Sequence, residues 1–125
     1  MTRVKICCIA NHLEAGLAIH QGASALGLVS EMPSGPGVIE EEEIVRIAAR
    51  IPPGVSSFLL TCRQDVAGIV EQQKRCGVNT LQLVDSLIEG SYQELKQALP
   101  GVRIVQVIHV TDENAIAEAR QLESQ

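Results

Sequence analysis

A short apolar run of strand-forming composition occurs five times along this chain, and a longer stretch with helical periodicity follows each run. Almost continuous apolar runs of this length are typical of strands buried on both faces, as in parallel sheets. The predicted strands are Val4 to Ala10, Ala25 to Ser30, Ser56 to Cys62, Thr80 to Asp85 and Arg103 to Val110. The predicted helices are His12 to Gln21, Glu40 to Ile51, Asp65 to Cys76, Ser91 to Leu99 and Asp112 to Leu122. The pattern predicts an α/β fold of five βα units with parallel strands.

Residues at the ends of the predicted helices support these boundaries. Side chains that can accept hydrogen bonds from first-turn amides are Asn11, Asp65 and Asp112. Glycines that can end a helix in a left-handed conformation are Gly22, Gly77 and Gly101. The acidic run Glu40 to Glu43 begins a predicted helix, where negative charge suits the helix dipole. We therefore interpret this run as part of a helix N-terminus rather than as a metal site.

Two architectures fit these units: an open doubly wound sheet, or part of a (βα)8 TIM barrel. An open sheet usually binds its ligand at a glycine-rich turn after the first strand, whereas that turn here reads Ala10-Asn11-His12. The turn favours the barrel. A complete barrel typically needs about 250 residues. We therefore interpret the 125 residues as one domain, 1–125, that forms the first five βα units of a longer barrel.

Charge and hydropathy exclude several classes of partner. The net charge is −5 and the ten Lys and Arg residues are scattered, so no basic stripe is available to bind nucleic acid. No apolar run approaches the roughly 18 to 20 residues that cross a bilayer, and Met1 to Arg3 leads into a strand rather than a signal peptide. We expect a cytoplasmic protein with no membrane partner. An aromatic content of 2% argues against a surface that stacks on bases.

The four cysteines are expected to be free thiols: Cys7, Cys8, Cys62 and Cys76. A chain with 46% hydrophobic residues can form its core without disulfides. Cys-x-x-Cys and His-x-x-x-His pairs, which are typical of zinc sites, do not occur. The sequence therefore predicts no metal site.

Several segments resemble those of one enzyme family. The run VKICCIA, from Val4 to Ala10, is followed by a predicted helix and then by QGASALGLV, and the segments MPSGPGVI, IPP and LQL come later. Together they resemble the phosphoribosylanthranilate isomerases, whose first strand reads Val-Lys-Ile-Cys-Gly-Ile-Thr and whose second begins Ala-Gly-Ala-Asp-Ala-Leu-Gly-Phe-Val. The resemblance covers essentially the whole chain and about the first 60% of a typical family barrel.

The resemblance implies an Amadori rearrangement in tryptophan biosynthesis, an isomerisation of the aldose–ketose type. An aminoaldose phosphate opens its ring and becomes an aminoketose phosphate, and no cofactor is needed. Cys7 occupies the position of the family's general base, the cysteine that removes the proton from C2. The candidate substrate-binding residues are Lys5, Gln82 and Gln106.

Strand geometry adds expectations of its own. Lys5 and Cys7 have the same parity and are predicted to face the barrel interior, with the lysine favouring the thiolate form of the cysteine. Cys8 is predicted to point toward the helices as a small buried hydrophobe. Gln106 and His109 have opposite parity, so only one of them can line the pocket. Gln106 is predicted to point inward, and His109 to lie at the rim or to face the helices.

The sequence also departs from the family pattern. The family loop after the second strand ends in an arginine that binds the anthranilate carboxylate, whereas the loop Pro33 to Gly37 carries no cation. Val84 and Cys8 stand where the family has histidine and glycine. The resemblance puts the general acid on a sixth strand and the phosphate site after the seventh and eighth. We expect both beyond Gln125, with these 125 residues inactive by themselves.

Two alternatives and one partner follow from these departures. The same barrel and base could act on a different sugar phosphate. A non-catalytic flavodoxin-like α/β binding module is the second alternative, and it requires the first strand to lie in the middle of an open sheet. If the chain ends at residue 125, its exposed sheet is expected to pair with a second copy, which gives a homo-oligomer.

Overall fold

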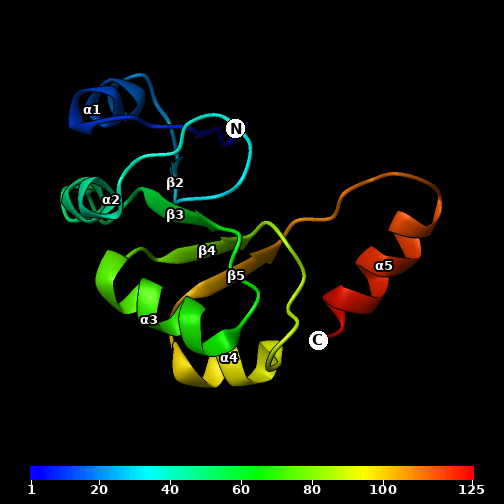
Figure 1. The fold of residues 1–125 in the computed structure, drawn as a ribbon. Coiled ribbons are helices and arrows are strands. Elements are labelled where there is room, and N and C mark those ends of the chain that lie inside the picture. The colour runs from blue at the N-terminus through cyan, green and yellow to red at the C-terminus, as the bar shows by residue number, and fades with distance from the viewer.

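The structure is a computed structural model that describes residues 1–125. It contains one sheet of five parallel strands, arranged side by side in the order of the sequence (Figure 1). The strands are β1 (Lys5–Ile6), β2 (Ala25–Val29), β3 (Ser56–Thr61), β4 (Thr80–Leu83) and β5 (Arg103–Gln106). The helices are α1 (His12–His20), α2 (Glu41–Ala48), α3 (Val66–Cys76), α4 (Tyr92–Ala98) and α5 (Asn114–Glu123). The prediction of five parallel βα units is confirmed.

The strand order separates the two predicted architectures. β1 pairs with β2 alone and lies at one edge of the sheet, while β5 lies at the other edge. This is the order of consecutive strands in a TIM barrel, whereas a flavodoxin-like sheet places its first strand between two others. The flavodoxin-like alternative is therefore wrong. None of the helices has the length and the apolar character that a membrane span requires.

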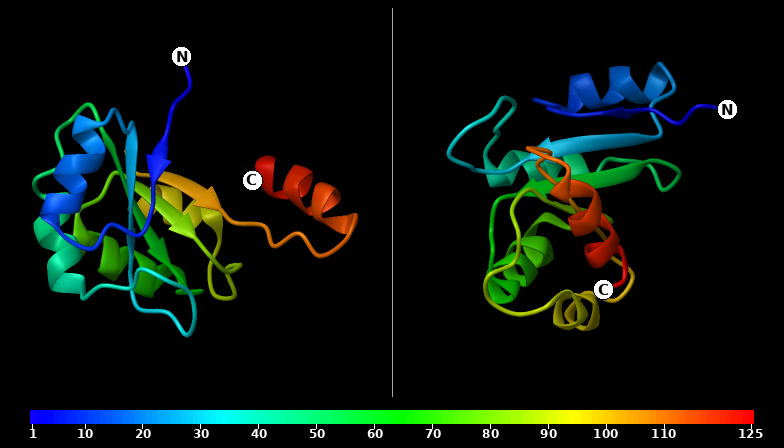
Figure 2. Two further views of the ribbon diagram at one scale, coloured as in Figure 1. Left: turned by 90° about the horizontal axis from the view of Figure 1, so that it is seen from above. Right: turned by 90° about the vertical axis from the view of Figure 1, so that its right-hand side faces the viewer.

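The hydrophobic core lies between the sheet and its helices. The apolar side chains without exposed surface on the strands are Leu26, Leu28, Leu59, Leu81 and Leu83. They pack with Ile44 of α2, Ile69 of α3 and Leu95 of α4. Helices α1 to α4 wrap the outer side of the sheet, whereas α5 stands apart from them at the end of an extended segment (Figures 1 and 2). Ala115 is the one buried residue of α5. The opposite, inner face of the sheet is left open.

The helix ends agree with most of the predicted caps. Asn11 Oδ1 accepts a hydrogen bond from the Glu14 amide at 2.9 Å, and Asp65 Oδ2 accepts one from the Gly68 amide at 2.6 Å. Gly77 ends α3 with a left-handed φ of 69°. The prediction for Asp112 is wrong by one residue, because Glu113 is the N-cap of α5 and Asp112 Oδ1 accepts instead from the Asn114 amide at 2.8 Å.

Candidate functional site

Lys5 reaches from β1 across the inner face of the sheet to β3 and β4. Its Nζ donates a hydrogen bond to Gln82 Oε1 at 2.8 Å and lies 4.8 Å from the centroid of the Phe58 ring. Lys5 pairs in register with Ala25, whose neighbour Leu26 faces the helices, so Lys5 lies on the opposite face. The structure thus brings together two predicted substrate-binding residues. It adds Phe58, which the sequence analysis missed and whose ring contributes a cation–π contact.

Cys7 follows β1 on the same inner face and lies beside Gly27 of β2. A Cβ atom added to Gly27 would lie 2.7 Å from Cys7 Sγ and 3.1 Å from Cys7 Cα, so only glycine leaves room for this sulfur. Leu26 and Leu28 face the helices, and Gly27 therefore faces the interior. Cys7 is exposed there. The sulfur of Cys7 thus lies on the predicted face. Gly27 is a further site residue, and the sequence indicates it only through the LGLV segment, which resembles the family.

Cys8 does not point toward the helices, and that prediction is wrong. Its φ is 59°, the one left-handed value of a non-glycine residue in the chain, which breaks the alternation of an extended strand. Cys8 Sγ donates to the Pro36 carbonyl at 3.6 Å, and a Cβ added to Gly37 would lie 2.7 Å from this sulfur. Cys8 therefore packs against the loop between β2 and α2. The family's glycine at this position was the signal for a left-handed residue.

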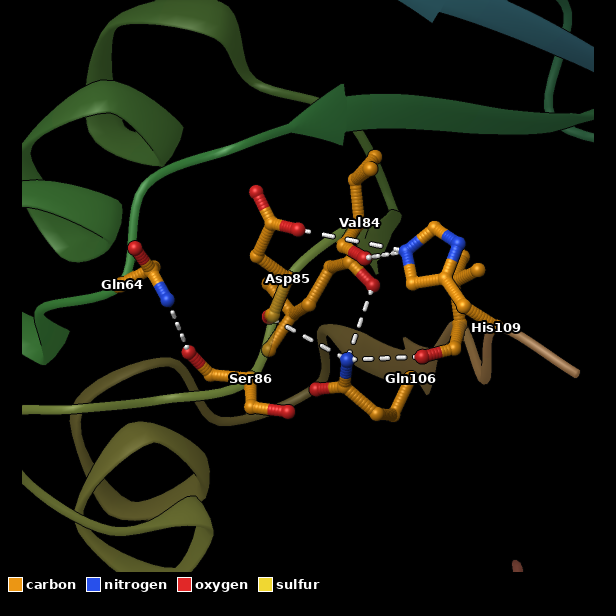
Figure 3. A network of polar contacts seen from close by, with 8 residues as sticks. Gln64, Val84, Asp85, Ser86, Gln106 and His109 are labelled. Atoms are coloured by element: carbon orange, nitrogen blue, oxygen red, sulfur yellow. Dashed lines mark hydrogen bonds and ion pairs between the residues drawn. The ribbon is translucent and has the colours of Figure 1, made fainter. Parts of the chain in front are cut away.

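The structure places Gln106 at the end of β5 and His109 in the segment that follows this strand. Gln106 is in register with Leu83, which faces the helices, and its Oε1 accepts a hydrogen bond from the Tyr92 hydroxyl of α4 at 2.7 Å. The prediction that Gln106 points inward is therefore wrong. Its Nε2 donates to the carbonyls of Leu83, Asp85 and Val107, so this amide joins the ends of β4 and β5 (Figure 3).

His109 lies at the rim of the sheet beside the end of β4. Its Nε2 is 2.9 Å from the Val84 carbonyl oxygen and 4.0 Å from Asp85 Oδ1, and both side chains of the His109–Asp85 pair are largely exposed (Figure 3). The rim position is one of the two that the sequence predicted. Tyr92 was the signal that the sequence analysis missed for Gln106, because a partly buried amide on the helix side needs a polar partner there.

A cavity of about 930 Å³ opens beside the loop between β2 and α2. Its charged lining consists of Glu31, Glu40, Glu41, Glu42 and Arg63. Cys62 follows β3, lines the cavity, and donates from Sγ to the Glu31 carbonyl at 3.4 Å. The carboxylates outnumber the cation, so the charge of the lining disfavours anions. Lys5, Cys7 and Gln82 are not among the lining residues. Nowhere in the chain do three or more histidine, cysteine, aspartate or glutamate side chains gather as metal ligands would.

A polar network connects the end of β3 to the start of α2. The buried Thr61 hydroxyl donates to Gln72 Oε1 at 2.7 Å, and Gln72 Nε2 donates to Glu41 Oε2 at 3.4 Å. Arg75 of α3 forms an ion pair with the same carboxylate. The Arg75 hydrogen bond lowers the pKa of Glu41, partial burial opposes that shift, and the Gln72 hydrogen bond adds to it. The network holds α2 and α3 at the border of the cavity.

Comparisons with known proteins agree on one family. The chain is 29% identical over 123 residues to the N-(5′-phosphoribosyl)anthranilate isomerase of Methanocella arvoryzae. The aligned part covers 98% of the chain and 58% of that relative. The crystal structure of the Thermotoga maritima enzyme matches with a TM-score of 0.80 at 25% identity, over 99% of the chain and 58% of the enzyme. A phosphoribosyl anthranilate isomerase in complex with reduced 1-(o-carboxyphenylamino)-1-deoxyribulose 5-phosphate gives the same score and identity, over 99% and 62%.

The relationship covers only part of the family barrel. No protein-family model matches the chain. The chain spans about half the length of the curated relatives it matches. The Thermotoga maritima enzyme is dimeric. The five parallel βα units thus match a little more than half of a family TIM barrel.

Proposed function

The chain is homologous to the N-terminal part of the phosphoribosylanthranilate isomerases, and we propose that it supplies the base-bearing part of a barrel that performs their aldose–ketose isomerisation. Cys7 is the general base, which takes a proton from the carbon next to the iminium of the opened sugar. Lys5 and Gln82 bind the sugar phosphate. The observation that carries this proposal is the position of Cys7, on the inner face, beside Gly27 and directly after the strand that carries Lys5.

The proposed roles follow from the chemistry of each group. A general base in this reaction must accept a proton from carbon, and a cysteine sulfur can take that role. Gln82 Oε1 accepts a hydrogen bond from the ammonium of Lys5 at 2.8 Å, which directs this exposed side chain across the inner face. An ammonium in this position also suits the negative charge of a sugar phosphate. Gln106 takes no part, because it faces α4.

The test compares two proteins in turnover of N-(5′-phosphoribosyl)anthranilate. One is the parent protein, expressed from its complete gene, and the other is its Cys7→Ala variant. We expect the variant to lose about 10²–10⁴-fold in kcat, which is the usual contribution of a general base, with binding of the reduced product analogue retained in calorimetry. Cys76→Ala is the matched control, because Cys76 is a thiol of the helix layer. No turnover by the parent protein, or equal turnover by Cys7→Ala, would contradict the proposal.

A second substrate is favoured by the loop between β2 and α2. This loop offers no arginine for an anthranilate carboxylate, and the adjacent cavity is lined by four glutamates and one arginine. We propose as the alternative that the barrel isomerises an aminoaldose phosphate whose amine substituent has no carboxylate. Comparison of kcat/KM for the anthranilate substrate and its aniline analogue separates the two. A preference for the anthranilate compound rules this alternative out.

The exposed inner face supports a proposed homo-oligomer. β1 and β5 are edge strands that each pair on one side only, and Val105 on the inner face is 41% exposed. Burial of such a face against a second copy would remove apolar surface from water. It would also give hydrogen-bond partners to the backbone groups at the sheet edges. Sedimentation velocity on the 125-residue chain tests this, and a concentration-independent monomer would contradict it.

A further inference from the structure

Two neighbouring thiols meet at the C-terminal end of β1. In an extended strand, Cys7 and Cys8 would point to opposite faces of the sheet. The left-handed φ of Cys8 turns its side chain out of that alternation. Burial raises the pKa of Cys8, and the adjacent Cys7 sulfur raises it further through its charge and a hydrogen bond. Geometry places both thiols at the same end of β2. Cys7 Sγ lies beside Gly27 of that strand, and Cys8 Sγ lies beside Gly37, whose neighbour Val38 forms a parallel bridge with Val29 at the end of β2.

Both thiols are reachable, and two glycines make room for them. Cys7 is exposed and Cys8 is half-buried. An added Cβ would meet Cys7 Sγ at 2.7 Å on Gly27 and Cys8 Sγ at 2.7 Å on Gly37, so each sulfur occupies the space that a glycine leaves. The bond from Cys8 Sγ to the Pro36 carbonyl is a weak 3.6 Å contact, which a ligand can replace.

The other two cysteines are not part of this pair. Cys62 lies after β3 and directs its sulfur to the Glu31 carbonyl. Cys76 is 3% exposed in the core, where burial raises the pKa of its thiol to about 11. They serve as internal controls, one half-exposed and one buried.

We propose that Cys7 and Cys8 form a dithiol site that binds a single soft, thiophilic centre, such as trivalent arsenic. With an organic arsenic(III) oxide, both S–H bonds break, two As–S bonds form, and the two protons leave with the oxide oxygen as one water molecule. No oxidation or reduction occurs. The second As–S bond is intramolecular, and such linkage raises affinity by about 10²–10⁴-fold over a single thiol. If Cys7 is the base proposed above, the adduct also removes its proton acceptor.

The test is intact-mass spectrometry of the protein with one equivalent of phenylarsine oxide, followed by competition. We expect one adduct with loss of one water, which resists excess 2-mercaptoethanol and is removed by the dithiol 2,3-dimercaptopropanol. The Cys62→Ser and Cys76→Ser variants should behave like the parent protein. The Cys7→Ser and Cys8→Ser variants should release the adduct more easily. The 2-mercaptoethanol concentration that removes it should be at least about tenfold lower than for the parent protein.

Several outcomes would overturn the site. If 2-mercaptoethanol removed the adduct from the parent protein as easily as from Cys8→Ser, the arsenic would be bound by a single thiol. An adduct that survives unchanged in Cys8→Ser would place the ligand elsewhere. Cys8→Gly provides a second variant that suits the left-handed φ, so loss of the fold cannot account for loss of binding. The readout is independent of turnover, and failure here leaves the proposed isomerase function untouched.

Discussion

The two faces of this sheet differ in nearly every physical property. The helix-facing side carries leucines without exposed surface, among them Leu59, Leu81 and Leu83. The inner side carries a lysine, a thiol and an amide, with Lys5 and Cys7 exposed to solvent. Both faces come from the same strands, at alternate positions. The stability of the chain therefore depends mainly on one face, while the chemistry we propose depends on the other.

The sharpest test of this division uses two adjacent leucines of β3. Leu59 is 0% exposed on the helix side, and Leu60 lies partly exposed on the inner side. Leu59→Ala should lower the free energy of unfolding by about 2–5 kcal/mol, because it removes buried methyl groups and leaves a cavity. Leu60→Ala should cost less than about half as much, since water already reaches that side. If both variants lost the same free energy of unfolding in urea, the two faces would contribute equally to stability.

Gly27→Ala should have the next largest effect and should act on the inner face. The new methyl group would lie 2.7 Å from Cys7 Sγ and 3.1 Å from Cys7 Cα, so backbone as well as side chain must move. We expect a loss of about 1–3 kcal/mol in stability, as for other overpacked positions, and a changed rate of Cys7 alkylation. Gly54→Ala is the control, because no atom lies within 4 Å of its added Cβ. Equal effects of both substitutions would contradict the close contact.

Cys8→Gly should stabilise the protein by a smaller amount. Cys8 holds a φ of 59°, which costs an L-residue roughly 1–2 kcal/mol, and the greater chain entropy of unfolded glycine offsets part of the gain. We expect a net increase of about 0.5–1 kcal/mol in the free energy of unfolding. Cys8→Ala removes the thiol but keeps the strained conformation, so it separates the two contributions. A loss of stability in Cys8→Gly would mean that the sulfur contacts outweigh the strain.

The smallest effect concerns the Glu41–Arg75 ion pair on the helix side. The pKa of Glu41 is lower in the folded protein than its ordinary value of 4.5, first because of the Arg75 hydrogen bond. Its stabilising contribution is therefore complete above pH 4.5 and is lost as the pH falls through the lower folded value. Arg75→Gln should lower the free energy of unfolding only slightly at neutral pH, since both side chains are partly exposed.

Urea unfolding at neutral and at acidic pH measures this effect. The difference between the parent protein and Arg75→Gln should shrink as the acid protonates Glu41. Arg46→Gln is a matched control, because Arg46 pairs with Glu43 one turn away on α2 without reaching a second helix. A difference that does not depend on pH would remove Glu41 from the explanation.

The fold was largely predictable because its signals are local. Each strand is an apolar run, and Asn11, Asp65 and Gly77 mark helix ends through bonds or dihedral angles that short segments determine. The errors arose where tertiary contacts override alternation. Gln106 faces the helices because Tyr92, on another element, supplies its partner. Cys8 departs from the extended strand conformation, and its side chain packs against Gly37 in the loop between β2 and α2.

The candidate site was predictable only in part. The parity of Lys5 and Cys7 and the position of Gln82 followed from strand geometry and the family resemblance. The contribution of Phe58 did not follow, because the lysine side chain crosses β2 to reach it, and strand alternation does not describe how far a long side chain extends. Gly27 was also missed, since its importance depends on the direction of a sulfur from the neighbouring strand.

The strand order has a consequence for how the chain folds. Every strand pairs with the next one in sequence, as when Lys5 pairs with Ala25 and Ala25 with Ser56. Each pairing closes a loop of only about 20–30 residues, so the entropic cost is similar at every step. The sheet can therefore grow one βα unit at a time during translation, each finished strand serving as the template for the next. Early contacts need no revision when later residues emerge.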